Sequence, residues 1–167
     1  PFMSSVQKRR GAQIERSAIW WLRRDLRLTD NQALVSALEA ADQVSPVFIL
    51  DPRLLASAYV GEKRTAFLFA GLRELDRSLR KLGSYLVLRS GDPEEQLTKL
   101  MRECQAQAIF AEPDYSPYAR QRDARLERSL PLRWVGSPAV QPPGVVVKNN
   151  GDPYTMFTPF SKAWKAL

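Results

Sequence analysis

Residues 18–31 read AIWWLRRDLRLTDN, and this stretch sets the expected architecture. Residues 18–22 form an unbroken apolar run, which is typical of a strand covered on both faces of a parallel sheet. An arginine-rich turn follows, and Thr29 and Gln32 then stand at the spacing of a capping box at the start of a helix. A buried strand that leads into a helix predicts the first half of a βαβ unit.

The same alternation of periods continues along the chain. Further strands are expected at residues 44–50, 85–88, 108–111 and 132–135, and further helices at 62–82, from 92 onward and at 117–129. Strands that alternate with helices indicate a parallel sheet with right-handed crossovers. We therefore predict an α/β fold: a Rossmann-like, doubly wound parallel sheet of about five strands with helices on both faces.

The domain organisation follows from length and composition. A chain of 167 residues suits one domain, and we assign residues 17–135 to it. Residues 1–16 are polar and basic, and we expect a disordered N-terminal extension there. Residues 136–167 contain a proline-rich connection and then a helix expected from Phe160 onward. Because the chain stops inside that helix, we expect a linker and the start of a further domain.

The composition excludes several classes of chemistry. The chain has no histidine, which rules out Ser-His-Asp and Cys-His catalysis and histidine-ligated metal sites. Cys104 is the single cysteine, so no intramolecular disulfide can form. No apolar run approaches the roughly 20 residues of a membrane span. We expect a cytoplasmic protein with no membrane partner, and we name no catalytic residue and no metal ligand.

The net charge of +7 favours contact with anions, although it does not by itself indicate nucleic-acid binding. Four arginines lie on the helix expected at residues 117–129, interleaved with Asp123 and Glu127. We interpret them as a solvated face with local ion pairs in preference to a phosphate-binding patch. Trp20 and Trp21 are expected in the core.

Ligands of open parallel sheets bind beyond the carboxyl ends of the strands. The loop after the first strand begins Arg23-Arg24-Asp25 and lacks glycine, so it is not a dinucleotide-binding fingerprint. Its arginines either clamp an anionic ligand or pair with Asp25 and fix the loop.

The loops after the second and fourth strands carry a mixture of polar and aromatic groups. Asp51-Pro52-Arg53 follows the second strand, and residues 112–118 combine two carboxylates with two tyrosines. Such a mixture suits a flat heteroaromatic ligand. Paired carboxylates at Asp51 and Asp114 would serve acid–base work or Mg²⁺, but no nucleophile or phosphate loop accompanies them. The structural alternative makes Asp114 or Ser116 a helix cap.

At this point a resemblance becomes visible. Residues 20–31 are similar to the opening signature of the DNA photolyase/cryptochrome family, an aromatic-x-R-x-D-L-R-x-x-D-N pattern. The similarity continues in register through Leu50-Asp51-Pro52, Gly91-Asp92-Pro93, residues 115–123, Pro142-Pro143 and residues 154–160, and it covers about residues 17–167.

The resemblance implies a function. In that family, photolyases use blue light and a reduced FAD, held by a C-terminal helical domain, to split cyclobutane pyrimidine dimers in DNA. The N-terminal α/β domain holds an antenna pigment, which is a deazaflavin, FMN or a methenyl-folate, and passes excitation to FAD. The chain would then be the antenna domain of a deoxyribodipyrimidine photolyase and inactive alone. Its partners would be the C-terminal FAD-binding domain of the same parent chain and, through it, damaged DNA.

The resemblance also places the pigment pocket in the loops after the first, second and fourth strands. The residues that match are Arg23, Arg24, Asp25, Leu50, Asp51, Arg53, Asp114, Tyr115 and Tyr118. Asp114 falls where deazaflavin-type members have an acid near the pigment, whereas Ser116 stands where some relatives carry an acid.

Three alternatives remain open. A cryptochrome-type photoreceptor would have a similar N-terminal domain. The chain would otherwise be a stand-alone flavin- or nucleotide-binding domain, or a basic nucleic-acid-binding module. Neither of the last two explains the Phe-Thr-Pro-Phe segment at residues 157–160 and the helix after it.

Overall fold

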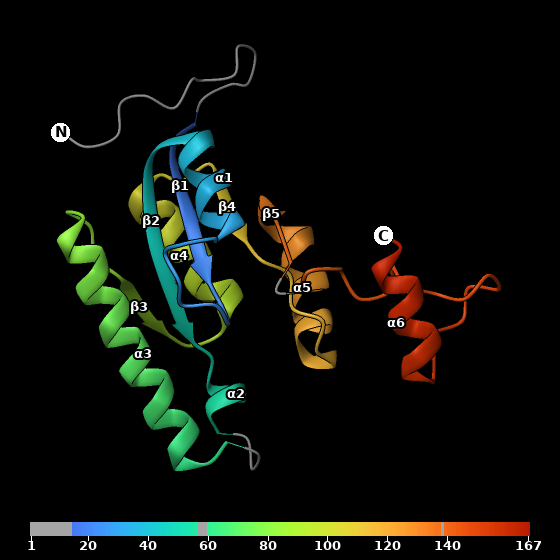
Figure 1. The fold of residues 1–167 in the computed structure, drawn as a ribbon. Helices are drawn as coiled ribbons and strands as arrows, with labels where there is room; N and C mark the ends of the chain where they lie inside the picture. Colours follow the sequence, from blue (N-terminus) through green and yellow to red (C-terminus); the bar gives the residue numbers. More distant parts are fainter. Residues whose placement is uncertain (1–14, 57–59, 138) are drawn as a thin grey trace.

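The computed structural model describes residues 15–56, 60–137 and 139–167, and it has the expected α/β fold (Figure 1). The sheet has five strands, all parallel, in the order β3-β2-β1-β4-β5. The strands are β1 (Glu15–Leu22), β2 (Ala41–Leu50), β3 (Val87–Ser90), β4 (Ala108–Ala111) and β5 (Leu132–Trp134). The helices are α1 (Gln32–Ala40), α2 (Pro52–Leu55), α3 (Glu62–Lys81), α4 (Pro93–Cys104), α5 (Pro117–Ser129) and α6 (Phe157–Lys165).

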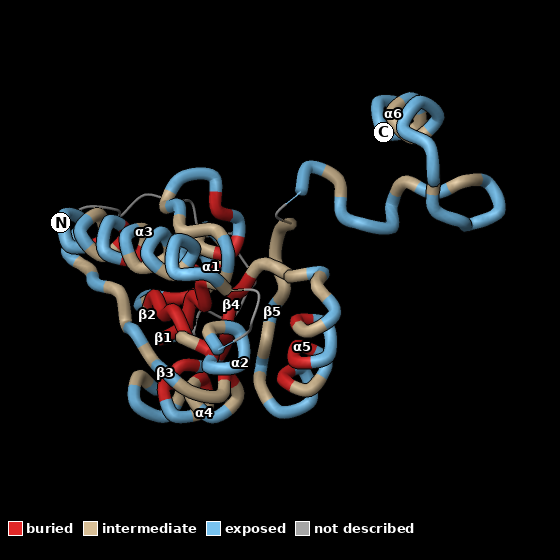
Figure 2. The backbone as a smooth tube through the Cα atoms, turned by 90° about the horizontal axis from the view of Figure 1, so that it is seen from below, coloured by how far each residue is buried: buried red, intermediate tan, exposed pale blue. Residues whose placement is uncertain are grey.

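The central strand β1 explains why the sheet is covered on both faces. Trp20 packs on one face with residues of α1 and α3, and Trp21 packs on the other with residues of α4 and α5. Both indoles are at least 97% buried, which confirms that they belong to the core. Figure 2 shows the buried segments gathered in the strands, with the outer faces of the helices exposed. The prediction of a doubly wound sheet is confirmed.

The start of α1 differs from the prediction. The prediction of a capping box formed by Thr29 and Gln32 is wrong, because Asn31 caps the helix. The side-chain oxygen of Asn31 accepts a hydrogen bond of 2.9 Å from the N–H of Leu34. Asn31 directly precedes the first helical residue, so its short side chain reaches the free N–H groups of the first turn. Thr29 lies two residues too early to do so.

Two other helix starts follow the sequence signals. Asp92 caps α4 by accepting a hydrogen bond of 3.0 Å from the N–H of Glu94. At α5 the choice left open between Asp114 and Ser116 falls to Ser116, whose hydroxyl accepts from the N–H of Ala119. In both helices proline occupies the first turn, where its missing N–H costs nothing.

Several boundaries lie elsewhere than the apolar runs predict. β2 begins at Ala41 rather than at 44, because Ala41 and Gln43 already pair with β1 although the side chains of Asp42 and Gln43 are exposed. β3 covers Val87–Ser90 instead of 85–88, and α6 covers Phe157–Lys165 instead of starting at Phe160. A pairing ladder continues past the buried part of a strand, and hydropathy does not record that extension.

The residues expected to lie outside the domain, at the two ends of the chain, are described to different extents. Most of the expected N-terminal extension, residues 1–14, lies outside the described residues, whereas Glu15 and Arg16 already belong to β1. After β5 the chain runs through a connection with one isolated bridge, Val147 to Pro153, to α6, which stands away from the sheet (Figure 1). Within the described ranges, no helix has the length and apolar character that crossing a bilayer requires.

Replacement of Leu97 by alanine tests the core under α4. Leu97 is fully buried against the face of the sheet that Trp21 faces. We expect a loss of about 2–5 kcal/mol in the free energy of unfolding, because the truncated side chain leaves a cavity. The measurement is chemical denaturation followed by circular dichroism. Lys99→Ala on the same helix, which removes an exposed pair with Glu95, should cost no more than about 0.5 kcal/mol. Equal losses would contradict the packing described.

Candidate functional site

The candidate site lies where the carboxyl ends of β1, β2 and β4 meet. The strand order places β1 beside β4, and their crossovers lead to opposite faces of the sheet. The loops that follow them therefore meet at the position where open parallel sheets bind ligands, and we call this position the crevice. These loops are residues 23–31 after β1, Asp51 with α2 after β2, and residues 112–116 after β4. The β1 loop is held against α3, where Leu26 lies so close to Gly71 that a Cβ there would come within 2.9 Å of its methyl carbon.

Arg23 joins the loop that follows β1 to the loop that follows β4. Its Nη1 donates to the backbone carbonyl of Glu112 at 3.1 Å, and its Nη2 lies 2.8 Å from the Oδ2 of Asp123 on α5. Its side chain is only 6% exposed. Burial and the neighbouring guanidinium of Arg122 lower the pKa of Arg23 to about 10, and Asp123 opposes them. Arg23 is therefore a buried cation that holds the crevice together.

Arg122 forms the second half of this buried network. Its Nε and Nη2 each donate to the Oδ1 of Asp123 at 3.0 Å, and its Nη1 lies 3.9 Å from the Oδ2 of Asp51. Its guanidinium is stacked over the rings of Trp21 and Tyr118 at 5.1 and 5.6 Å. Two arginines and two aspartates thus balance their charges beneath the crevice, as buried charges require.

Aromatic rings enclose the guanidinium of Arg23. It lies 4.8 Å from the ring centre of Trp21 and 5.0 Å from that of Trp134, the last residue of β5. The two indoles approach each other at 6.4 Å with their planes tilted by 44°. Attraction between a cation and an aromatic face strengthens as water is removed, so these contacts stabilise the buried charge.

Asp51 connects β2 to α5. It is 4% exposed, and its Oδ1 accepts a hydrogen bond of 3.0 Å from the N–H of Arg53, which caps α2. Its Oδ2 accepts a hydrogen bond of 2.5 Å from the hydroxyl of Tyr118. Burial raises the pKa of Tyr118 to about 12, and the hydrogen bond to Asp51 adds to this rise. The phenol therefore stays protonated at neutral pH.

Arg24 and Asp114 lie beside this buried network, and we call them the rim and the network the floor. Arg24 differs from every residue of the floor in being exposed. Arg24, with a side chain 67% exposed, lies 3.6 Å from the carboxylate of Asp114. Asp114 also accepts a hydrogen bond of 2.9 Å from the N–H of Ser116. Burial works to raise the pKa of Asp114, but this hydrogen bond and the charge of Arg24 outweigh it and hold the pKa below its usual value. Asp114 is thus a carboxylate beside an accessible cation.

The structure brings five of the nine predicted site residues together, and the other four lie at the edges of the site or pair elsewhere. Arg23, Asp51 and Tyr118 belong to the floor, and Arg24 and Asp114 form the rim. Asp25 instead accepts hydrogen bonds from Arg27 at 2.9 Å, which is the alternative in which the loop pairs with itself.

The remaining predicted residues lie at the edges of the site. Leu50 packs against the core on the α1 and α3 side, Arg53 is exposed and contributes its backbone N–H, and Tyr115 is 37% exposed. Among the described residues, no three carboxylate or thiol groups gather as a metal site needs.

The interpretation of α5 as a solvated face is wrong for two of its residues. Arg122 and Asp123 are buried, whereas Arg120 and Arg128 are exposed as expected. A signal was present: Ala119, Arg122, Asp123 and Leu126 have the i, i+3, i+4, i+7 spacing of a buried helical stripe. Trp134 carried no comparable signal, since only the sheet order brings it beside Trp21.

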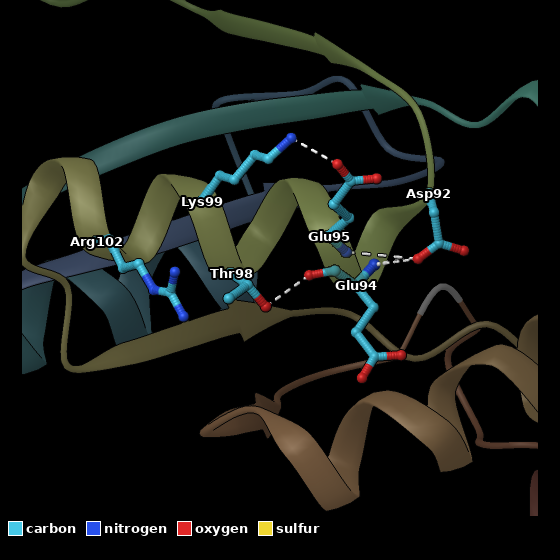
Figure 3. Close-up of a pocket in the computed structure, with 6 residues that line it drawn as sticks. All are labelled: Asp92, Glu94, Glu95, Thr98, Lys99 and Arg102. Atoms are coloured by element: carbon cyan, nitrogen blue, oxygen red, sulfur yellow. Dashed lines mark hydrogen bonds and ion pairs between the residues drawn. The ribbon is translucent and has the colours of Figure 1, made fainter.

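Two hollows lie away from this site. One, of about 370 Å³, lies along α4 (Figure 3) and is lined by Asp92, Glu94, Glu95, Thr98, Lys99 and Arg102. Its side chains are largely committed to one another, for example Lys99 to Glu95 at 2.5 Å. The other, of about 400 Å³, lies between α3 and β3 and is lined by Phe69, Leu72, Arg73, Asp76, Arg77, Leu86 and Leu88. Neither hollow contains a residue of the candidate site.

Replacement of Asp123 by alanine tests the buried network. The change leaves the guanidiniums of Arg23 and Arg122 without their shared carboxylate, and we expect a loss of about 3–5 kcal/mol in the free energy of unfolding. Urea denaturation measures it. Glu95→Ala, which removes an exposed ion pair, should cost at most about 1 kcal/mol. A loss at Asp123 no larger than the loss at Glu95 would show that the network is not coupled as described.

Comparison with known proteins shows which family the chain resembles. A model of the family described as DNA photolyase matches residues 18–167. The deoxyribodipyrimidine photo-lyase of Synechococcus sp. is 36% identical over 155 residues, which cover 89% of this chain and 32% of that protein. Cryptochrome-1 of Spalax judaei is 38% identical over 112 residues, covering 67% of this chain and 19% of that protein.

A solved structure shows the same arrangement. The bacterial class III photolyase from Agrobacterium tumefaciens superposes with a TM-score of 0.82 at 31% identity, over 98% of this chain and 34% of that one. The chain thus spans about a third or less of the length of each of these three proteins. With the strand order and the matched residues, this similarity shows that the chain belongs to the photolyase/cryptochrome family and has the fold of its N-terminal α/β domain.

Proposed function

We propose that this chain is the antenna-chromophore-binding domain of a deoxyribodipyrimidine photolyase. The observation that supports this most directly is the set of ion pairs beyond β1, β2 and β4, where the Arg24–Asp114 pair lies beside a buried, charge-balanced network. A planar ligand needs such a combination of firm walls and a few orienting polar groups.

The residues present fit a planar, partly anionic pigment. Arg24 and Arg53 are exposed and can pair with an anionic group, while Asp114 and Tyr118 supply oxygen atoms for the edge of a heterocycle. A deazaflavin, FMN and a methenyl-folate all have this character. When bound, the pigment would absorb light and supply excitation energy. The role of the chain is to hold the ring at a fixed distance and orientation, because energy transfer depends on both.

The partners belong to the same proposal. FAD would be held by a C-terminal domain of the parent chain, and damaged DNA would be bound by the full-length protein. Arg23 and Arg122 are already paired, so the arginines of the floor are not offered to DNA phosphates. We further propose a cytoplasmic location, where a thiol such as that of Cys104 stays reduced.

A cryptochrome-type photoreceptor is the second candidate. The specific observation in its favour is that a cryptochrome matches this chain at an identity similar to that of the photo-lyase. A light-dependent repair assay on the full-length parent protein separates the two, because a photolyase restores damaged DNA under blue light and a photoreceptor does not.

Pigment binding to the purified chain tests the antenna proposal. Mixed with deazaflavin, FMN or methenyl-folate, the protein should bind one of them and change its fluorescence. Asp114→Ala should weaken that binding by roughly tenfold, because a carboxylate that accepts a hydrogen bond from the ring is lost. Fluorescence titration gives both results.

The matched control is Glu95→Ala, an acid on the exposed side of α4, which should leave the affinity unchanged. If none of the three pigments binds the wild-type chain, the antenna proposal fails. If Asp114→Ala binds as tightly as the wild type, Asp114 does not line the pocket.

A further inference from the structure

The hydrogen bond between Tyr118 and Asp51 fixes where the phenol proton lies. The hydroxyl of Tyr118 is 2.5 Å from the Oδ2 of Asp51, and Asp51 is only 4% exposed. A carboxylate can only accept hydrogen bonds, so the phenol is the donor. A hydroxyl has one proton, and here it is used. Any ligand group that reaches the phenol oxygen of Tyr118 therefore meets only lone pairs.

Arg122 holds this arrangement from the side. Its own side chain is 7% exposed and is anchored by two hydrogen bonds to Asp123. From that position its Nη1 lies 3.9 Å from the same Oδ2 of Asp51, and its guanidinium is stacked over the ring of Tyr118 at 5.6 Å. Arg122 thus contacts both partners of the hydrogen bond. The Oδ1 of Asp51 is occupied by the N–H of Arg53, so the carboxylate cannot rotate without breaking a helix cap.

The phenol of Tyr118 stays protonated at neutral pH and does not become an anion. Burial, and after it the hydrogen bond to Asp51, raises the pKa of Tyr118 to about 12. The second oxygen-bearing group of the site, the carboxylate of Asp114, is likewise an acceptor. The oxygens of Tyr118 and Asp114 therefore both accept hydrogen bonds, and Arg24 and Arg53 are exposed cations beside them.

We propose, in an inference that rests on the proposed function, that Tyr118 selects pigments that present a ring N–H. Arg122 is the positioning residue that keeps the hydroxyl of Tyr118 turned to Asp51. The chemical class is a heterocycle with an imide-type N–H on one edge and an anionic group elsewhere. Flavins and deazaflavins share such an N–H. Removal of that donor leaves the lone pairs of Tyr118 without a partner. Removal of Arg122 takes away the guanidinium that lies over the ring of Tyr118, so the phenol is freer to turn away from Asp51 even though the N–H of Arg53 still holds the carboxylate.

The first experiment needs no pigment. Tyrosines labelled with ¹³C at Cζ are titrated by NMR, and the resonance missing in Tyr118→Phe identifies Tyr118. The wild-type resonance should titrate near pH 12, and in Asp51→Asn the pKa should fall toward the ordinary value of about 10. A Tyr118 that titrates near 10 in the wild-type protein would show that its proton is not held by Asp51, and the inference would be overturned.

The second experiment compares FMN and 8-hydroxy-deazaflavin riboside with their N3-methyl derivatives by fluorescence titration. The wild-type chain should prefer the unmethylated ring by about tenfold. In Tyr118→Phe that preference should largely disappear. Arg122→Lys, which keeps the charge, should reduce it in the same way, whereas Arg128→Lys at the exposed end of α5 should preserve it.

Each failure has its own signature. A wild-type chain that binds neither unmethylated ring overturns the proposed function for these pigments and this inference with it. A chain that binds them but shows the same methyl preference in Tyr118→Phe overturns the inference alone, because the preference is then steric. An unchanged preference in Arg122→Lys, with an unchanged thermal midpoint, removes Arg122 as the positioning residue.

Discussion

The shared carboxylate of Asp123 is the interaction on which the site depends. It lies between the guanidiniums of Arg23 and Arg122, both of which are more than nine-tenths buried. Two like charges at such depth are tolerated only if carboxylates neutralise them, because an unpaired buried charge costs several kcal/mol. Through Arg23 the carboxylate fixes the ends of β1 and β4, and through Arg122 it reaches Asp51 at the end of β2. One side chain on α5 thus connects three strand ends.

This arrangement separates holding the site from recognising a ligand. The floor is charge-balanced and closed by the rings of Trp21, Trp134 and Tyr118. The charge that remains accessible lies at the rim, chiefly on Arg24. A rigid floor with an adaptable rim suits a domain whose task is to hold a flat molecule in one orientation. It suits less well a nucleic-acid-binding module, which presents its arginines to solvent so that they can reach phosphates.

The apolar periods of the sequence predicted the fold well, and they failed where polar residues have structural roles. The run at residues 18–22 predicted a strand covered on both faces, and the strand–helix alternation then allowed few topologies. The sequence patterns did not predict the start of β2 at Ala41 or the cap at Asn31, because a pairing ladder and a cap depend on backbone geometry that hydropathy does not describe. On α5, the charges predict exposure, whereas the i, i+3, i+4, i+7 spacing predicts that Arg122 and Asp123 are buried, as they are.

By itself, the sequence determined the α/β class, the resemblance to the family and the three loops that carry the site. The class follows from local periodicity, and the resemblance follows from the matching motifs. The rule that ligands gather beyond the carboxyl ends of parallel strands points to the loops after all the strands, and the resemblance singles out three of them as the candidate site. Only the tertiary structure decided which polar groups meet. Arg23 and Asp123 are 100 residues apart in the chain, and Asp51 and Tyr118 are 67 apart. Pairing across such separations depends on the order in which strands lie in the sheet, and no local pattern of residues encodes that order.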